Sequence, residues 1–277
     1  MKLLCTPLLA LLLTSCASSL PTPAQRGQHM DALASAHNWQ KLRLPTNRFV
    51  LTAYAPAAPV KAQSLTIYIE GDGLAWMSRS LPSDDPTPNN PLGLELALRH
   101  PNSAAAYLGR PCQNIDPKEW NNCTDEYWTR RRFSPEVIEA SNQSISALKA
   151  RAGAEQLILV GYSGGAAIAA LVAARRQDVT RFVSVAGNLN TSAWTSLHHI
   201  EALTGSLNPA DEWSRLQNIP QIHFVGGKDS NITPEIVNAY RMRFPAEKRP
   251  ETRVLPDFNH ACCWIEQWPA LMGETAP

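Results

Sequence analysis

The sequence predicts a single α/β domain, with a mostly parallel central sheet and helices on both of its faces. From residue 49 onward, short apolar runs rich in β-branched residues alternate with segments of helical spacing. One of these runs, 157–160, passes through a glycine-rich turn directly into a long alanine-rich segment. Strand–helix alternation of this kind is typical of parallel sheets, since parallel neighbours need a crossover between them.

The expected elements follow one another along the chain with short polar connections. Segment 134–150 shows the reasoning for a helix, because Val137, Ile138, Ile145 and Leu148 fall on one helical face and Pro135 suits its first turn. The expected strands are 48–53, 65–69, 104–108, 156–160, 181–186, 219–225 and 252–255, and the expected helices are 92–99, 134–150, 165–176 and 234–244.

The segment 188–218 is too long for a plain connection between a strand and the next element. It contains Trp194, His198, His199 and Trp213. We expect it to form a cap-like insertion over the C-terminal edge of the sheet.

The first residues have the features of an export signal. Lys2 supplies a positive start, 3–13 is almost entirely apolar, and small residues lead to Cys16. The apolar run is shorter than the roughly 20 residues that span a bilayer. An ordinary cleaved signal peptide and a buried helix are the alternatives, but 13–16 resembles a bacterial lipobox, in which the cysteine is lipidated.

This interpretation divides the chain into a signal peptide (1–15), a lipidated tether with an N-terminal segment (16–48) and the main domain (49–277). It predicts a bacterial envelope protein that is held at a membrane through Cys16. Ala17 and Ser18 carry no acidic retention signal, which by the same resemblance favours the outer membrane.

Charge and cysteine content narrow the possible partners. The 25 Lys and Arg residues nearly balance the 24 Asp and Glu residues, so the chain offers no electrostatic footprint for nucleic acid.

Beyond Cys5 and Cys16, four cysteines remain, an even number that predicts disulfides in an oxidising compartment. No paired Cys-x-x-Cys spacing suggests zinc, and no other metal site is expected. The four candidates are Cys112, Cys123, Cys262 and Cys263.

The pairing of these cysteines stays open at this point. Cys112 and Cys123 bracket a polar loop without an apolar period, and such a loop gains stability from a covalent clasp. That pairing leaves Cys262 and Cys263 to bond each other or to stay reduced. Cross-pairing between the two groups is the other alternative.

The strongest chemical signal is Gly161-Tyr162-Ser163-Gly164-Gly165, placed between an apolar strand and an alanine-rich helix. A sharp strand-to-helix turn exposes such a serine, and the glycines let the strand and helix approach closely. The helix N-terminus below it favours developing negative charge. A serine that merely caps the helix is the plainer alternative, but the context indicates that Ser163 is a nucleophile.

This turn resembles the nucleophile elbow of the α/β-hydrolase superfamily. More narrowly, the chain is similar to a group of bacterial α/β-hydrolase lipoproteins, on the segments 67–73, 85–88, 109–113 and 259–264. The resemblance implies the α/β-hydrolase fold and a serine hydrolase without metal or organic cofactor.

In the superfamily, the nucleophile, the acid and the histidine follow one another along the chain. His260 follows a plausible acid and lies beyond the last expected strand, whereas His223 lies inside an apolar run and is expected in the core. Asp229 comes at the carboxyl end of the strand 219–225, the edge where such sheets bind ligands. Asp257 is the alternative acid, although it lies only three residues before His260.

The expected oxyanion hole combines the backbone N–H of Gly164 with that of Asp72 or Gly73. Many relatives have a histidine where this chain has Glu70. A buried, unpaired carboxylate is costly, so we expect Glu70 to pair with Arg110 or with one of Arg130, Arg131 and Arg132. That carboxylate also argues against strongly anionic substrates.

The resulting functional expectation is a carboxylic-ester hydrolase that works through an acyl-enzyme on a small-molecule or lipid ester. A peptidase or amidase with the same residues is one alternative, since the fold does not fix the leaving group. A catalytically silent envelope binding module is another.

Overall fold

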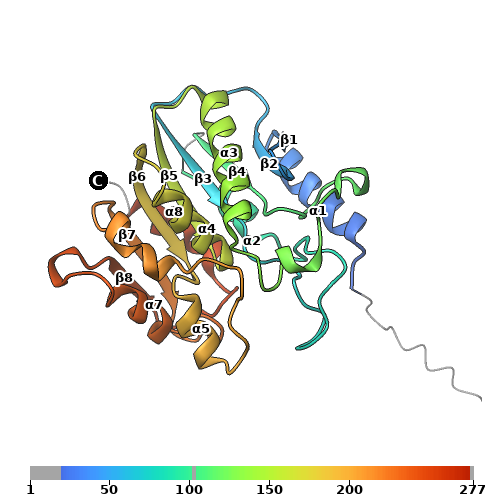
Figure 1. Cartoon of the computed structure of the whole chain (residues 1–277). Helices are drawn as coiled ribbons and strands as arrows, with labels where there is room; N and C mark the ends of the chain where they lie inside the picture. Colours follow the sequence, from blue (N-terminus) through green and yellow to red (C-terminus); the bar gives the residue numbers. More distant parts are fainter. Residues whose placement is uncertain (1–19, 102–103, 275–277) are drawn as a thin grey trace, which may run out of the picture.

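The computed structural model describes residues 20–101 and 104–274, which form an eight-stranded sheet between two layers of helices (Figure 1). The strand order is β1-β2-β4-β3-β5-β6-β7-β8. Pairing is antiparallel from β1 to β2 and from β2 to β4, and parallel from β4 to β8, which confirms the predicted fold class. The strands are β1 Trp39–Pro45, β2 Val50–Pro56, β3 Ser64–Ile69, β4 Ala105–Leu108, β5 Gln156–Tyr162, β6 Val179–Val185, β7 Gln221–Gly226 and β8 Glu251–Leu255.

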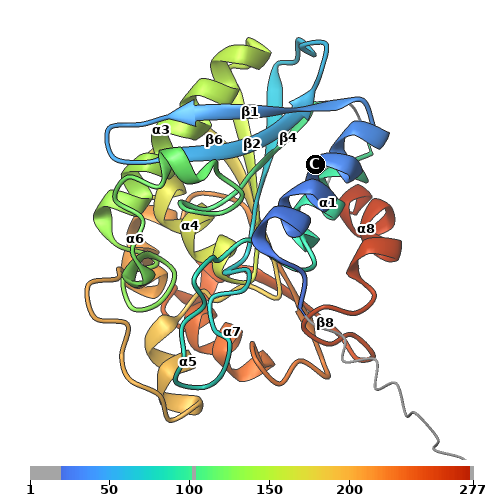
Figure 2. The ribbon, with the colours of Figure 1, turned by 90° about the vertical axis from the view of Figure 1, so that its right-hand side faces the viewer.

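Helices cover both faces of the sheet and enclose two separate cores. One core contains residues of α3 and α4, and the other contains residues of α1, α2 and α8, which lie together on the opposite side in Figure 2. The α-helices are α1 Pro23–Ala36, α2 Leu92–Leu98, α3 Pro135–Ala152, α4 Gly164–Ala173, α5 Thr191–Leu197, α6 Trp213–Leu216, α7 Pro234–Arg241 and α8 Trp264–Gly273, and the 3₁₀ turns are η1 Pro117–Glu119, η2 Asp125–Tyr127, η3 Pro209–Glu212 and η4 Ala246–Lys248.

The central strands are apolar on both faces because each face is covered by helices. In β3, Ile67 and Ile69 belong to the core under α3 and α4, while Tyr68 between them belongs to the core under α1, α2 and α8. This alternation follows from the two-residue period of a strand. His223 of β7 is fully buried beside Ser184, as the sequence predicted for a core histidine.

The sequence suggested that the main domain begins at residue 49, but the folded domain begins earlier in the chain. α1 buries Met30 and Ala34, and β1 pairs with β2 along its whole length. The sequence signal was weak because β1 is an edge strand whose side chains are half-buried or exposed in turn. The N-terminal segment is therefore an integral part of the sheet (Figure 2).

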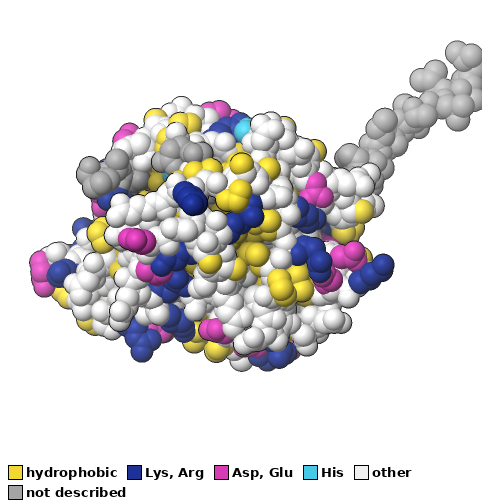
Figure 3. All heavy atoms as spheres, turned by 90° about the horizontal axis from the view of Figure 1, so that it is seen from above, with side chains coloured by type: hydrophobic (Ala, Val, Ile, Leu, Met, Phe, Trp, Pro, Cys, Tyr) yellow, Lys and Arg dark blue, Asp and Glu magenta, His cyan; other side chains and the backbone are white. Residues whose placement is uncertain are grey.

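The parallel strands end at one edge of the sheet, which is the lower edge in Figure 1. The insertion 188–218 folds at this edge, with α5 beside α7. None of the helices within the described residues is long and apolar enough to cross a membrane. On the face seen from above in Figure 3, basic and acidic side chains are interspersed, in keeping with the nearly neutral net charge.

Candidate active site

Ser163 lies at the sharp turn between β5 and α4. Its backbone adopts φ 50° and ψ −121°, a strained conformation for a residue other than glycine. The flanking glycines permit this turn: a Cβ on Gly161 would lie 2.3 Å from Cα of Ala166, and one on Gly165 would lie 2.2 Å from the carbonyl oxygen of Ile69. The predicted elbow is therefore present.

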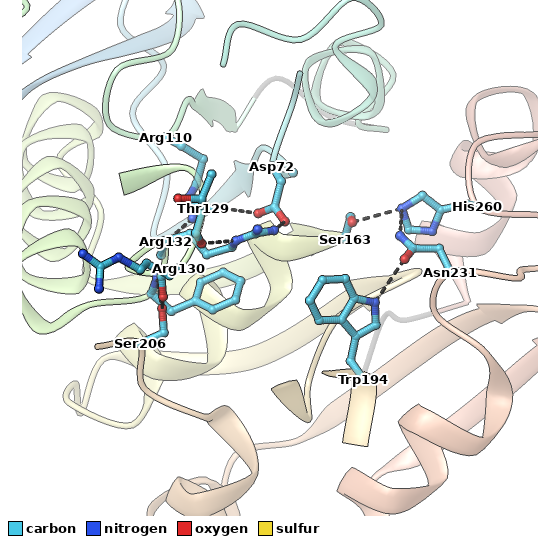
Figure 4. Close-up of polar contacts among 12 residues, drawn as sticks. Asp72, Arg110, Thr129, Arg130, Arg132, Ser163, Trp194, Ser206, Asn231 and His260 are labelled. Atoms are coloured by element: carbon cyan, nitrogen blue, oxygen red, sulfur yellow. Dashed lines mark hydrogen bonds and ion pairs between the residues drawn. The ribbon is translucent and has the colours of Figure 1, made fainter. Parts of the chain in front are cut away.

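The structure brings Ser163, His260 and Asp229 into one hydrogen-bonded row. Figure 4 shows the contact between Ser163 and His260. Nε2 of His260 lies 3.0 Å from Oγ of Ser163, and Nδ1 lies 2.8 Å from Oδ2 of Asp229. The other oxygen of Asp229 accepts the backbone N–H groups of Asn231 and Ile232 at 2.8 and 2.9 Å. The Asp229 side chain is fully buried, so its position is fixed by these contacts.

The alternative acid does not reach the histidine. Asp257 is 86% exposed in its side chain and pairs with Lys228 at 2.8 Å. Because the carboxylate of Asp229 can only accept, the geometry assigns the proton of the neutral imidazole to Nδ1. The lone pair of Nε2 then faces the hydroxyl of Ser163.

Asn231 is a residue of the site that the sequence analysis missed. Its Nδ2 lies 3.3 Å from Nε2 of His260, and its Oδ1 accepts the indole N–H of Trp194 at 3.0 Å. An indole can only donate, so Trp194 fixes the amide with its NH₂ group toward His260. Asparagine two residues after an aspartate is common in turns, which is why its sequence signal was indistinct.

The backbone groups proposed for the oxyanion hole lie near Ser163. Asp72 and Gly73 line the same pocket as Ser163, and the carboxylate of Asp72 rests against Gly164, where an added Cβ would meet Oδ1 at 2.1 Å. Within 20–101 and 104–274, no acceptor hydrogen-bonds the N–H of Asp72, Gly73 or Gly164. These donors are therefore available to a substrate oxygen.

Two buried arginines hold the carboxylate of Asp72. Arg110 donates to Oδ1 at 3.0 Å and Arg132 donates to Oδ2, and each arginine is only 4% exposed. Although burial opposes ionisation, the two guanidinium groups outweigh it and lower the pKa of Asp72. The two guanidinium groups thus offset the negative charge of the Asp72 carboxylate.

Glu70 does not pair with an arginine, so that prediction was wrong. Its carboxyl group accepts the N–H groups of Gly71, Gly93 and Leu94 at 2.9, 3.1 and 3.4 Å, the last two in α2. Burial raises its pKa to about 7, while these hydrogen bonds oppose the rise. The arginines gather at Asp72 instead, while Glu70 lines the same pocket as Ser163.

Disulfides join Cys112 to Cys123 and Cys262 to Cys263, so cross-pairing does not occur. The second bond begins two residues after His260. The carbonyl oxygen of His260 also accepts the Tyr162 hydroxyl and the Trp264 indole at 3.3 and 3.2 Å. These two contacts tie the loop that carries His260 to β5 and α8, whereas the bond between Cys262 and Cys263 lies within the loop.

Ser163 opens into a pocket of about 340 Å³ at the C-terminal edge of the sheet. Among the described residues, no cluster of three or more His, Cys, Asp and Glu side chains could hold a metal ion. The pocket is lined by Glu70, Asp72, Gly73, Leu74, Pro88, Asn89, Asn90, Tyr162, Ser163, Asn231 and His260.

No family model and no curated protein matches the sequence. The fold does match solved structures. An esterase from Pyrococcus furiosus superposes with a TM-score of 0.57 and 12% identity, over 85% of this chain and 88% of that one. XC6422 of Xanthomonas campestris, an α/β serine hydrolase without a lid, gives 0.55 and 14% over 85% and 93%.

An α/β serine hydrolase homologue from Coxiella burnetii gives a TM-score of 0.57 with 16% identity, over 86% of this chain and 97% of that one. At such low identity these likenesses establish the fold alone. The chain has the α/β-hydrolase fold.

Proposed function

We propose that this chain is a serine hydrolase that cleaves carboxylic esters through an acyl-enzyme. The observation that carries the proposal is the row Ser163–His260–Asp229, with contacts of 3.0 and 2.8 Å at a strained elbow. A serine and a histidine within hydrogen-bond reach, with the histidine oriented by a third group, form the arrangement of an activated nucleophile. The solved structures that share the fold and are named esterases support the choice of esters.

In the proposed reaction, His260 removes the hydroxyl proton of Ser163 through Nε2 as Oγ attacks the ester carbonyl carbon. Asp229 keeps Nδ1 protonated and stabilises the imidazolium that forms. His260 then gives the proton to the leaving alcohol, and water repeats the sequence to release the acid.

The tetrahedral intermediate carries a negative oxygen, which the N–H of Gly164 and that of Asp72 or Gly73 would bind. The carboxylate of Asp72 lies close to this position, and alone it would oppose an oxyanion. Arg110 and Arg132 pair with this carboxylate and offset its charge, which reduces its opposition to the oxyanion.

We also propose that the enzyme is a lipoprotein of the bacterial envelope. The lipidated residue would be Cys16, after removal of 1–15, and both lie outside the described residues. The proposed substrate is a small-molecule or lipid ester. Exchange of Cys16 for serine should move the protein out of the membrane fraction, whereas a wild-type protein that is soluble and cut elsewhere would contradict the anchor.

The test of the reaction is hydrolysis of a short-chain nitrophenyl ester by the chain from residue 17 onward. Ser163→Ala should lower turnover by roughly 10⁴- to 10⁶-fold and abolish labelling by a fluorophosphonate. Ser184→Ala is the matched control, because Ser184 also lies 2.9 Å from a histidine, His223, but both are buried in the core. Near-native turnover of Ser163→Ala would refute the proposal, and preference for a nitroanilide would identify an amidase instead.

A further inference from the structure

Large exposed hydrophobic side chains gather around the edge of the sheet where the pocket opens. Of the eight such residues within the described part of the chain, three lie in the loop 75–83 after β3, and two lie at and just after the end of α5. Loop 75–83 and α5 project from the same end of the molecule in Figures 1 and 2. The five are Trp76, Met77, Leu81, Leu197 and Ile200.

Loop 75–83 holds its hydrophobic side chains outward. The N–H of Met77 donates to the carbonyl oxygen of Leu81 at 2.8 Å, and Trp76 bridges to Pro82. At the base, the indole of Trp128 donates to the carbonyl oxygen of Ser83 at 3.0 Å. The exposed fractions of Trp76, Met77 and Leu81 are 40, 49 and 59%, so an ordered loop presents them to the outside.

The tip of this loop is cationic. Arg79 lies between the hydrophobic side chains and is exposed, and no acidic side chain within the described residues pairs with it. The acidic residues Asp84 and Asp85 lie at the base of the loop, and Asp85 pairs with Arg26. A tryptophan with aliphatic neighbours and an arginine suits the boundary between acyl chains and anionic headgroups.

The chain enters the fold beside this loop. Arg26 of α1 donates to the carbonyl oxygen of Pro21 at 2.8 Å and to that of Asp85 at 3.0 Å. Cys16, the proposed lipid site, lies five residues before Pro21, a span of at most about 18 Å. An anchor at Cys16 would therefore keep the base of the loop close to the membrane surface.

We propose that the face around the pocket docks on a phospholipid bilayer, with Trp76, Met77 and Leu81 entering the acyl boundary and Arg79 contacting the headgroups. The pocket mouth then faces the lipid surface, so esters held in that surface reach Ser163 without first leaving it. The anchor supplies proximity, and loop 75–83 supplies orientation.

The test is flotation of the chain from residue 17 onward, which has no anchor and keeps every described residue. With vesicles of phosphatidylethanolamine and phosphatidylglycerol in equal parts, exchange of Trp76, Met77 and Leu81 for serine should weaken vesicle partition at least tenfold. Exchange of Met242 and Val254 for serine is the matched control, because these residues are 51 and 48% exposed but lie at the end of α7 and in the edge strand β8, outside loop 75–83. The control should float like the wild type.

A second variant tests the charge. Arg79→Glu should weaken partition to the anionic vesicles severalfold and leave partition to phosphatidylcholine vesicles unchanged. Neither set of loop variants should alter turnover of a soluble ester without vesicles, because none of these side chains lines the pocket.

The proposal is overturned if the wild-type chain does not float, or if the loop and control variants lose binding equally. A dimer in sedimentation velocity that only the loop variant disrupts would instead identify a second copy of the chain as the partner. Ser163→Ala should float like the wild type, so failure of docking and failure of the proposed reaction are distinguishable.

Discussion

Glu70→Gln should change how the stability of the fold depends on pH. The carboxyl group of Glu70 is buried in the pocket wall, and burial raises its pKa from 4.5 to about 7. Between pH 4.5 and about 7, Glu70 is therefore protonated in the folded protein but ionised in the unfolded chain. In this window, the contribution of Glu70 to stability is present at low pH and is lost as the pH rises.

The size of the effect follows from the two pKa values. A difference of about 2.5 units between 4.5 and about 7, at 1.36 kcal/mol per unit, corresponds to about 3 kcal/mol. Buried His223 acts in the opposite direction, because burial lowers its pKa to about 3 and its contribution is lost as the pH falls. The difference in unfolding free energy between variant and wild type removes the contribution of His223, which both proteins share. The change of that difference with pH removes the constant cost of the substitution.

The assay is denaturant unfolding of both proteins at pH values from about 4 to 8. The free energy of unfolding of Glu70→Gln, relative to the wild type, should rise by about 3 kcal/mol across this range. Glu95→Gln changes a half-buried position of α2, the helix whose N–H groups donate to Glu70, and it is the control that should show no such rise. A flat difference for Glu70→Gln would mean that the N–H groups that donate to Glu70 fully offset the effect of burial on its pKa.

Three further changes test the site. Asp229→Asn should lower kcat by about 10⁴-fold, because the amide no longer fixes the imidazole, whereas Asp257→Asn should leave kcat unchanged; equal losses would contradict the choice of acid. Trp194→Phe should lower kcat roughly tenfold with little change in KM, because the Asn231 amide loses the contact that fixes it; an unchanged kcat would remove Asn231 from the mechanism. Mild reduction of the bond between Cys262 and Cys263 should lower turnover, measured by ester hydrolysis, and leave the melting temperature nearly unchanged, measured by calorimetry. A Tm that falls together with turnover would instead assign the bond a structural role.

The parts that the sequence predicted well are those whose signal is local along the chain. Gly161 and Gly165 flank Ser163 within five residues, and the strand before them and the helix after them have clear periods. Asp229 and His260 could be placed because each follows an expected strand of a parallel sheet, at the edge where such sheets bind ligands. The edge strand β1 and helix α1 escaped prediction, since neither buries a full apolar face.

The partners of the buried charges could not be predicted, because they come from distant parts of the chain. Asp72 lies 38 residues from Arg110 and 60 from Arg132, and no spacing rule links them. Glu70, two residues before Asp72 and at the end of the same strand, was the partner expected from the sequence. The fold decides between the two: Glu70 turns toward the start of α2, and Asp72 turns toward the arginines.

Glu70 and Asp72 therefore differ in protonation behaviour, although both carboxyl groups lie in the wall of the same pocket. Burial without a counter-charge favours the protonated form of Glu70, whereas two guanidinium groups keep Asp72 ionised. The ion pairs also fix the side chain whose own backbone N–H would bind the oxyanion. A charge at Asp72 would oppose the proposed oxyanion if it stood alone, but Arg110 and Arg132 offset that charge and hold the side chain in place before an ester binds.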